Sequence, residues 1–192
     1  MNGLRALPFA AIAALALGMA ATLAALQGDP PFGAVEMGPW RTWPRVGDSE
    51  IDPYARAVLA ASGALPLGSG EGLAFVAKTD DFDAALDARC DYRISGGAPS
   101  ARFWTLAAYD VDGDLRPNAA NRYGLTSTAL LRESGGGFVI DASRDAQPGN
   151  WLPLGEKSRF ILVLRAYQLT SSAVAGALDG LVLPKITREG CS

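Results

Sequence analysis

The chain has 192 residues, no histidine and a formal net charge of −3 at pH 7, from 17 basic and 20 acidic side chains. The absence of histidine excludes Ser-His-Asp and Cys-His catalysis and every metal site that needs an imidazole ligand. Lysine and arginine form no long run, so we predict no nucleic-acid partner. The length suits one domain of ordinary size plus a membrane anchor.

The first element is an apolar segment, residues 6–26, which contains no charged side chain. As a helix rising 1.5 Å per residue it would span roughly 31 Å, enough to cross a hydrocarbon core of ~30 Å. Arg5 and the terminal amine precede it, and positive charge stays on the cytoplasmic side. We therefore predict a single-pass anchor with the carboxy-terminal domain outside; the alternative is a cleaved signal peptide, which also exports the domain.

Three parts follow from composition: an anchor at residues 1–27, a linker at 28–50 and a β domain at 51–192. The linker is rich in Pro, Gly and Trp, and its Trp40 and Trp43 would sit at the lipid interface or pack on the domain. Asp52-Pro53 predicts the start of a short helix, because Asp is a good N-cap and Pro suits the first helical position. Gly63 would end this helix.

Short strands separated by turn signals dominate the remainder of the chain. They are predicted at residues 72–78, 89–95, 101–110, 138–142, 159–168 and 181–186. The strand at 159–168 is apolar on both faces, which indicates a central position, whereas Pro184 indicates an edge. A short helix capped by Thr126 is predicted over 126–132, a helical turn over 171–178 and a loop over 143–158. The predicted fold is all-β: a jelly-roll-like β-sandwich with one short helix, preceded by a single transmembrane helix.

The two cysteines, Cys90 and Cys191, suggest a disulfide because the count is even and the domain is exported. The bond would tie the penultimate residue to a predicted strand about 100 residues earlier, and two unpaired thiols are the alternative. A catalytic thiol is disfavoured because no histidine is present to activate it.

Two acidic groups offer candidate chemistry. Asp110, Asp112 and Asp114 resemble the start of a calcium loop, but position twelve of that loop is Asn121 where glutamate is needed. A solvated hairpin tip is the alternative. The second group is an acidic loop of four carboxylates, which would serve either glycoside hydrolysis or simple solvation: Asp80, Asp81, Asp83 and Asp87.

Polar and aromatic residues in the predicted loops form a candidate ligand site for an acidic or planar molecule. Its members are Arg102, Trp104, Arg122, Tyr123, Asn150, Trp151 and Arg165. Arg165 lies in an apolar strand, where a charge must be paired or line a cavity. The alternative is a structural network in which arginines satisfy loop carbonyls and tryptophans plug the ends of the sandwich. We assign no catalytic residue and no cofactor.

Four motifs in order resemble the family of the domain of unknown function 1214: residues 101–110, 121–123, 150–153 and 160–167. Residues 52–57 and the surroundings of Cys90 resemble its short, membrane-anchored proteobacterial members. The resemblance implies a jelly-roll-like sandwich domain that lies in the periplasm and is anchored to a bacterial inner membrane by one helix. Larger members carry a companion domain, of unknown function 1254, so the short form implies a separate partner protein.

Two functions therefore stand open. The first is a non-enzymatic, membrane-tethered binding or assembly module that acts with a partner protein. The second is a histidine-independent envelope hydrolase that uses carboxylates and arginines on a glycan or lipid-derived substrate. Convergence of Arg102, Arg122, Asn150 and Arg165 in an open cleft beside an acid would favour the hydrolase.

Overall fold

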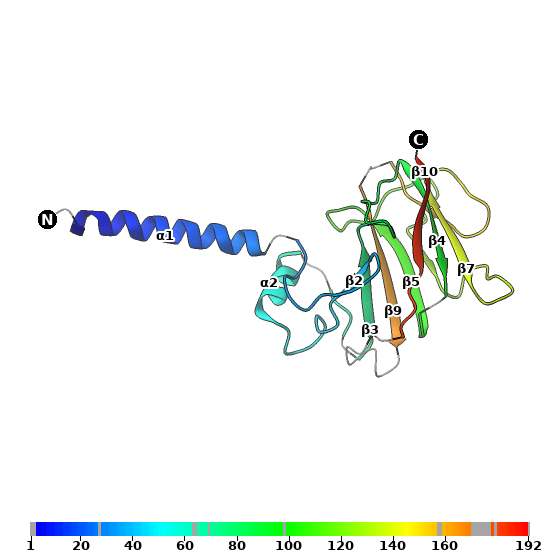
Figure 1. Ribbon diagram of the computed structural model, residues 1–192, viewed down its shortest axis with the longest axis horizontal. Helices are drawn as coiled ribbons and strands as arrows, with labels where there is room; N and C mark the ends of the chain where they lie inside the picture. Colours follow the sequence, from blue (N-terminus) through cyan, green and yellow to red (C-terminus); the bar gives the residue numbers. More distant parts are fainter. Residues whose placement is uncertain are drawn as a thin grey trace.

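The computed structural model describes residues 3–26, 28–62, 65–68, 70–97, 99–156, 159–169, 178 and 180–191. Helix α1 (Gly3–Ala25) projects away from the β domain, and the short helix α2 (Pro53–Ser62) lies beside the carboxy-terminal end of α1 (Figure 1). Within α1, the stretch Leu7–Ala25 has a mean hydropathy of 2.0 and is long enough to span a membrane. The predicted apolar helix is confirmed, and its length and composition suit an anchor or a signal sequence.

The domain consists of two β-sheets, as the predicted sandwich requires. The strands are β1 (Val35–Met37), β2 (Trp40–Thr42), β3 (Gly72–Ala77), β4 (Cys90–Gly96), β5 (Ala101–Tyr109), β6 (Gly124–Thr126), β7 (Phe138–Ser143), β8 (Trp151–Pro153), β9 (Ile161–Leu169) and β10 (Lys185–Cys191). One sheet has the order β1-β2-β3-β9-β5-β6 and the other β10-β4-β7-β8. All pairs are antiparallel except β7 with β8. The jelly-roll connectivity stays a prediction.

The core lies between the sheets and follows from the alternation of the strands. In β5, Trp104, Leu106 and Ala108 point inward and are at most 2 % exposed. The Trp104 ring contacts Phe138 of β7 across the core, with centroids 4.9 Å apart. The inward side chains of β9 are equally buried, and the strand pairs with β3 and β5 on its two sides, which confirms its predicted central position.

Residues 28–50 were expected to form a linker, but they include β1 and β2. Strand β2 pairs with β3, so this segment extends the larger sheet. Trp40 is 1 % exposed and donates from Nε1 to the Pro184 carbonyl oxygen (2.7 Å). Trp43 Nε1 donates to the Pro30 carbonyl oxygen (3.0 Å), so both indoles bind within the domain.

Local chemistry explains one helix and corrects another. Asp52 caps α2 (Pro53–Ser62) by accepting from the backbone N–H groups of Tyr54 (2.9 Å) and Ala55 (3.3 Å), as predicted. The helix expected over 126–132 is wrong, because Thr126 ends β6 by pairing with Thr105. Residues 127–129 form only a turn. The predicted end at Gly63 and most of the turn predicted at 171–178 lie outside the described residues.

The carboxy-terminal strand β10 lies at the edge of the smaller sheet, as Pro184 predicts. Its bounds differ from the predicted 181–186, because the strand begins only after Pro184 and continues to Cys191 through its pairing with β4. Cys191 pairs in register with Cys90 of β4, and the two form the predicted disulfide. The bond therefore ties the last strand to its neighbour at the edge of the sandwich.

Candidate functional site: the groove along strand β8

The seven predicted ligand residues do not converge in one cleft. Trp104 is a core residue, and its Nε1 has no hydrogen-bond partner among the described residues. Arg165 donates from Nη1 to the Tyr109 hydroxyl (2.8 Å) on the outer face of the larger sheet. Arg102 is exposed at the start of β5 and bonds Gln168 (3.3 Å), while Tyr123 is exposed just before β6. These four residues therefore occupy separate places.

The other three predicted residues, Arg122, Asn150 and Trp151, lie together beside β8, a strand within the loop predicted over 143–158. The Arg122 guanidinium lies 5.9 Å from the centre of the Trp151 ring and donates to the Trp151 carbonyl oxygen (3.1 Å). Trp151 Nε1 donates to the Ser143 carbonyl oxygen (3.1 Å), which holds the indole in place. An arginine stacked on a half-buried tryptophan is a common recognition pair.

Asn150 has a structural role. Its Oδ1 accepts from the Leu131 N–H (2.8 Å), and its Nδ2 donates to the carbonyl oxygens of Leu131 and Val139 (2.8 Å each). These bonds join the 127–133 segment to β7 and β8. With its carboxamide satisfied by backbone groups, Asn150 positions the neighbouring Trp151 rather than contacting a ligand.

A groove of about 870 Å³ lies between β8 and the 116–120 loop, which connects β5 to β6. We call it the β8 groove and define it by residues 116–120, Arg144, Trp151, Pro153, Gly155 and Glu156. Arg122 lies beside it, over the Trp151 ring, and together with Asn150 it lines a separate, smaller hollow of about 330 Å³. The β8 groove thus contains Trp151 from the predicted set and has Arg122 next to it.

The walls of the β8 groove are held by residues that sequence reasoning missed. Asn118 donates from Nδ2 to the carbonyl oxygens of Arg116 (3.1 Å) and Arg122 (2.9 Å) and accepts from the Arg122 N–H (3.1 Å). Gly155 has a positive φ of 62°, and a Cβ at this position would collide with the Pro117 carbonyl oxygen. The Arg-Pro-Asn sequence at 116–118, a turn signal with a charge beside it, was the available clue.

Arg116 lies under the groove and is only 2 % exposed. Its Nε donates to the Leu154 carbonyl oxygen and its Nη1 to that of Arg159 (2.7 Å), and its guanidinium lies 5.6 Å from the Phe160 ring centre. Burial lowers the pKa of this guanidinium, and the nearby Asp110 carboxylate counteracts that shift. Arg116 therefore has a structural role, because its guanidinium joins the 116–120 loop to the backbone at Leu154 and Arg159.

The described charged side chains that are exposed in and beside the β8 groove are two arginines and one acid. Arg144 and Glu156 line the groove and Arg122 lies next to it, and Arg144 donates to the Glu156 backbone carbonyl oxygen (3.0 Å). In the described part of the chain, Glu156 is the one carboxylate that lines the groove. Exposed guanidinium groups of this kind can pair with an acidic group.

The candidate calcium residues at 110–114 form a tight turn. Asp110 is 2 % exposed, and its Oδ1 accepts from the N–H groups of Asp112 (3.1 Å) and Asp114 (3.0 Å). Gly113 supplies the positive φ of 92° that the turn requires. The described residues contain no group of three His, Cys, Asp or Glu side chains that is placed to hold a metal ion.

The carboxylates of the acidic loop are also tied to the backbone. Asp80 accepts from the N–H groups of Phe82 and Ala84 (3.0 Å each) and forms an ion pair with Arg188 of β10 (3.1 Å). Asp81 accepts from the Ile186 N–H (3.0 Å), and burial raises its pKa. These contacts fasten the loop to the edge strand β10.

Asp87 gives this region a dependence on pH. Hydrogen bonds from the Arg89 side chain and backbone lower the pKa of Asp87 from its ordinary value of 3.8 to about 2. Because the pKa is lower in the folded state, the Asp87 carboxylate contributes fully to stability above pH 3.8, and this contribution is lost as the pH falls toward 2. We expect Asp87→Asn to lower the free energy of unfolding at pH 6, as measured by urea unfolding. The difference in this free energy between the variant and wild type should disappear as the pH falls from 3.8 toward 2.

The matched control for this experiment is Asp91→Asn, which removes an exposed carboxylate from β4. A gap for Asp87→Asn that is the same at pH 6 and at low pH would contradict the assigned role of the Asp87 charge.

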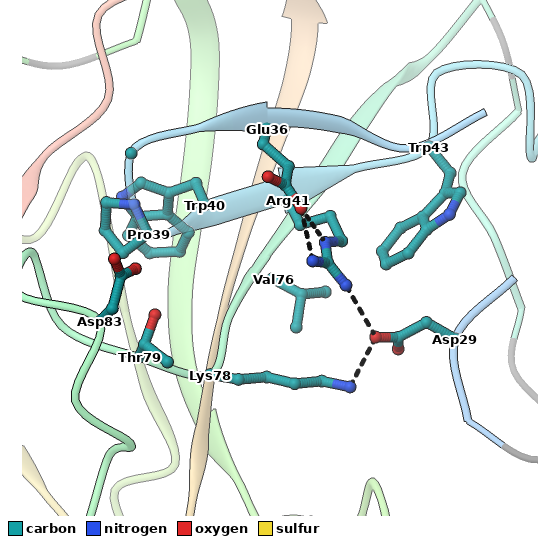
Figure 2. Close-up of a pocket in the computed structure, with 11 residues that line it drawn as sticks. Asp29, Glu36, Pro39, Trp40, Arg41, Trp43, Val76, Lys78, Thr79 and Asp83 are labelled. Carbon is teal, nitrogen blue, oxygen red and sulfur yellow. Dashed lines mark hydrogen bonds and ion pairs between the residues drawn. The ribbon is translucent and has the colours of Figure 1, made fainter. Parts of the chain in front are cut away.

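A second hollow, of about 210 Å³, lies where the chain enters the domain (Figure 2). Four of the five charged residues that line it form a chain of ion pairs: Glu36 with Arg41, Arg41 with Asp29 (3.8 Å), and Asp29 with Lys78 (2.6 Å). This network attaches residue 29 to the larger sheet, and Asp83 lies outside it.

Two packed sheets behind an apolar helix define a β-sandwich protein with a candidate anchor and a groove along β8. Residues 71–171, more than half of the chain, match the family described as protein of unknown function (DUF1214), and the chain belongs to this family. This confirms the family resemblance. No curated protein matches the chain.

Two solved structures are similar. The VPA0106 protein from Vibrio parahaemolyticus superposes with a TM-score of 0.60 and 21 % identity, over 73 % of this chain and 36 % of that one. An uncharacterized protein from Burkholderia cenocepacia has a TM-score of 0.41 and 16 % identity, over 77 % and 46 %. The first likeness supports the fold alone. This chain spans less than half the length of either solved chain.

Proposed function

We propose that this protein is a non-enzymatic binding module that α1 tethers to the membrane. Its β8 groove holds an extended, acidic segment of a partner protein. The observation that carries the proposal is the groove itself, which is lined by Trp151 and the exposed Arg144, with the Arg122 guanidinium beside it over the Trp151 ring. Arginine and tryptophan are the residue types that most often dominate protein–protein binding energy.

The location and the partner belong to the same proposal. With α1 crossing a bacterial inner membrane, the groove faces the periplasm, as the charge before the helix favours. The partner proposed is a separate protein that carries the companion domain of unknown function 1254. The solved Vibrio chain offers indirect support, since this chain covers only 36 % of its length and leaves room there for a further domain.

Charge reversal in the groove tests this proposal. We expect the full chain, purified from native membranes in mild detergent, to retain one partner at near-stoichiometric yield. Arg122→Glu with Arg144→Glu should lower that yield about tenfold or more, because the acidic segment would then meet like charge. The measurement is quantitative mass spectrometry of the purified material.

Arg102→Glu is the matched control, since it makes the same change at an exposed arginine away from the groove. It should leave the yield unchanged. Equal recovery from all three proteins, or no partner at stoichiometric yield from wild type, would contradict the proposal.

A further inference from the structure

The end of α1 is joined to the β domain by a short, fastened segment. Asp29 follows Ala25, the last residue of α1, by four positions and forms an ion pair with Lys78 (2.6 Å) at the end of β3. The Trp43 indole donates to the Pro30 carbonyl oxygen (3.0 Å) just beyond it. Figure 2 shows the Asp29–Lys78 ion pair and the nearby Trp43 side chain. The domain therefore stands close to the end of α1.

Two exposed aromatic rings lie in this same region. Phe32 is 62 % exposed and Tyr54 is 47 % exposed, and their rings pack edge to face with centroids 5.8 Å apart. Tyr54 lies in the first turn of α2, which flanks the end of α1 on the anchor side of the domain (Figure 1). Exposed apolar groups that lie together indicate an interaction surface, whereas single apolar residues scattered over a surface do not.

The surroundings of the aromatic pair are mainly apolar, with one more acidic than basic side chain. A hollow of about 340 Å³ beside Phe32 is lined mainly by apolar groups, including Trp43, Val46, Ile51 and Ala55. The charged residues in residues 45–56 are two arginines and three acids: Arg45, Arg56, Asp48, Glu50 and Asp52. Such a surface matches the interfacial layer of a bilayer, which accepts aromatic rings, and has no excess of positive charge for anionic lipid.

We infer that Phe32, Tyr54 and the adjoining surface of α2 insert into the lipid interface beside α1, as a second membrane contact of this protein. The inference rests on α1 being the membrane anchor, as proposed above. The anchor supplies the second contact with a high effective concentration of lipid, so two aromatic rings suffice where an unanchored protein would need more. This contact would fix the orientation of the sandwich relative to the membrane.

Depth-dependent quenching of new tryptophans tests the inference. The full chain carrying Phe32→Trp or Tyr54→Trp is reconstituted into phosphatidylcholine vesicles, with or without lipid brominated near the carbonyl end of its acyl chains. The fluorescence of each new tryptophan, taken as the variant's emission minus that of wild type, should fall by about twofold or more in brominated vesicles, because aromatic rings at the interface contact these bromines. High salt should not reverse this quenching, since the contact is apolar.

Leu131→Trp is the matched control. Leu131 is 68 % exposed and bonds Asn150 beside β7 and β8, and Figure 1 places β7 on the side of the domain far from α1. Its added emission should not respond to the brominated lipid.

The intact mass of the protein recovered from the vesicles separates this inference from the proposed anchor. If the mass includes residues 1–26 and both new tryptophans are quenched no more than Leu131→Trp, the interfacial contact is wrong while the anchor stands. If residues 1–26 have been removed in membrane-derived protein, the anchor and the contact both fail.

Discussion

Arg116→Met is expected to lower the free energy of unfolding by about 3–5 kcal/mol, the typical cost of removing one partner from a buried charged network. The substitution roughly keeps the side-chain volume but leaves the Leu154 and Arg159 carbonyl oxygens without their donor. It also leaves the buried Asp110 without its neighbouring cation. Urea unfolding of the full chain in detergent, followed by tryptophan fluorescence, measures the change.

Arg122→Met is the control for this prediction, because it removes the same group from an exposed position above Trp151. It should change stability by no more than about 0.5 kcal/mol. A loss below about 1 kcal/mol for Arg116→Met would show that the buried guanidinium does not hold the floor of the β8 groove.

Removal of the Cys90–Cys191 disulfide should lower stability by up to about 4–5 kcal/mol in the chain-entropy model, since the bond closes a loop of about 100 residues. The double variant Cys90→Ser/Cys191→Ser measures this loss at equilibrium. Treatment of the wild type with a thiol reductant should produce the same loss, and the reductant should have no effect on the double variant. Equal stability with and without the bond would contradict its role in holding β10 to β4.

Elements that a local sequence pattern indicates, such as alternating apolar residues or a helix cap, could be predicted from the sequence. The alternation of Trp104, Leu106 and Ala108 with their neighbours predicted β5, and the structure shows that this face is the inward one. Asp52-Pro53 predicted the start of α2. Pro184 identified the edge that β10 occupies. In each case the local pattern and the tertiary contacts favour the same structure.

Elements decided by distant partners could not be predicted. Thr126 is a good helix cap in isolation, but pairing with Thr105 makes it the end of a strand. Strand β8 has three residues, ends in Pro153 and runs parallel to β7, so it has no alternation to recognise. Its position depends on Asn150 bonds to Leu131 and Val139.

The same limit explains the candidate site. The predicted set consisted of polar and aromatic residues in loops, and it included Arg122 and Trp151, which the structure brings together beside β8. It could not tell that Arg165 is bonded to the Tyr109 hydroxyl, a partner 56 residues away. It also missed Asn118 and Arg144, because their places in the groove depend on how the 116–122 loop folds against β8.

Site-specific photo-cross-linking in native membranes tests the central claim most directly. A photoreactive side chain is placed at Ala120, which is exposed and lines the β8 groove, and for comparison at Val111, which is 62 % exposed on the 110–114 turn. We predict one cross-linked protein from position 120, an acidic segment at the attachment point, and no such product from position 111. Absence of a protein cross-link from position 120, or the same products from both positions, would contradict a partner bound in the groove.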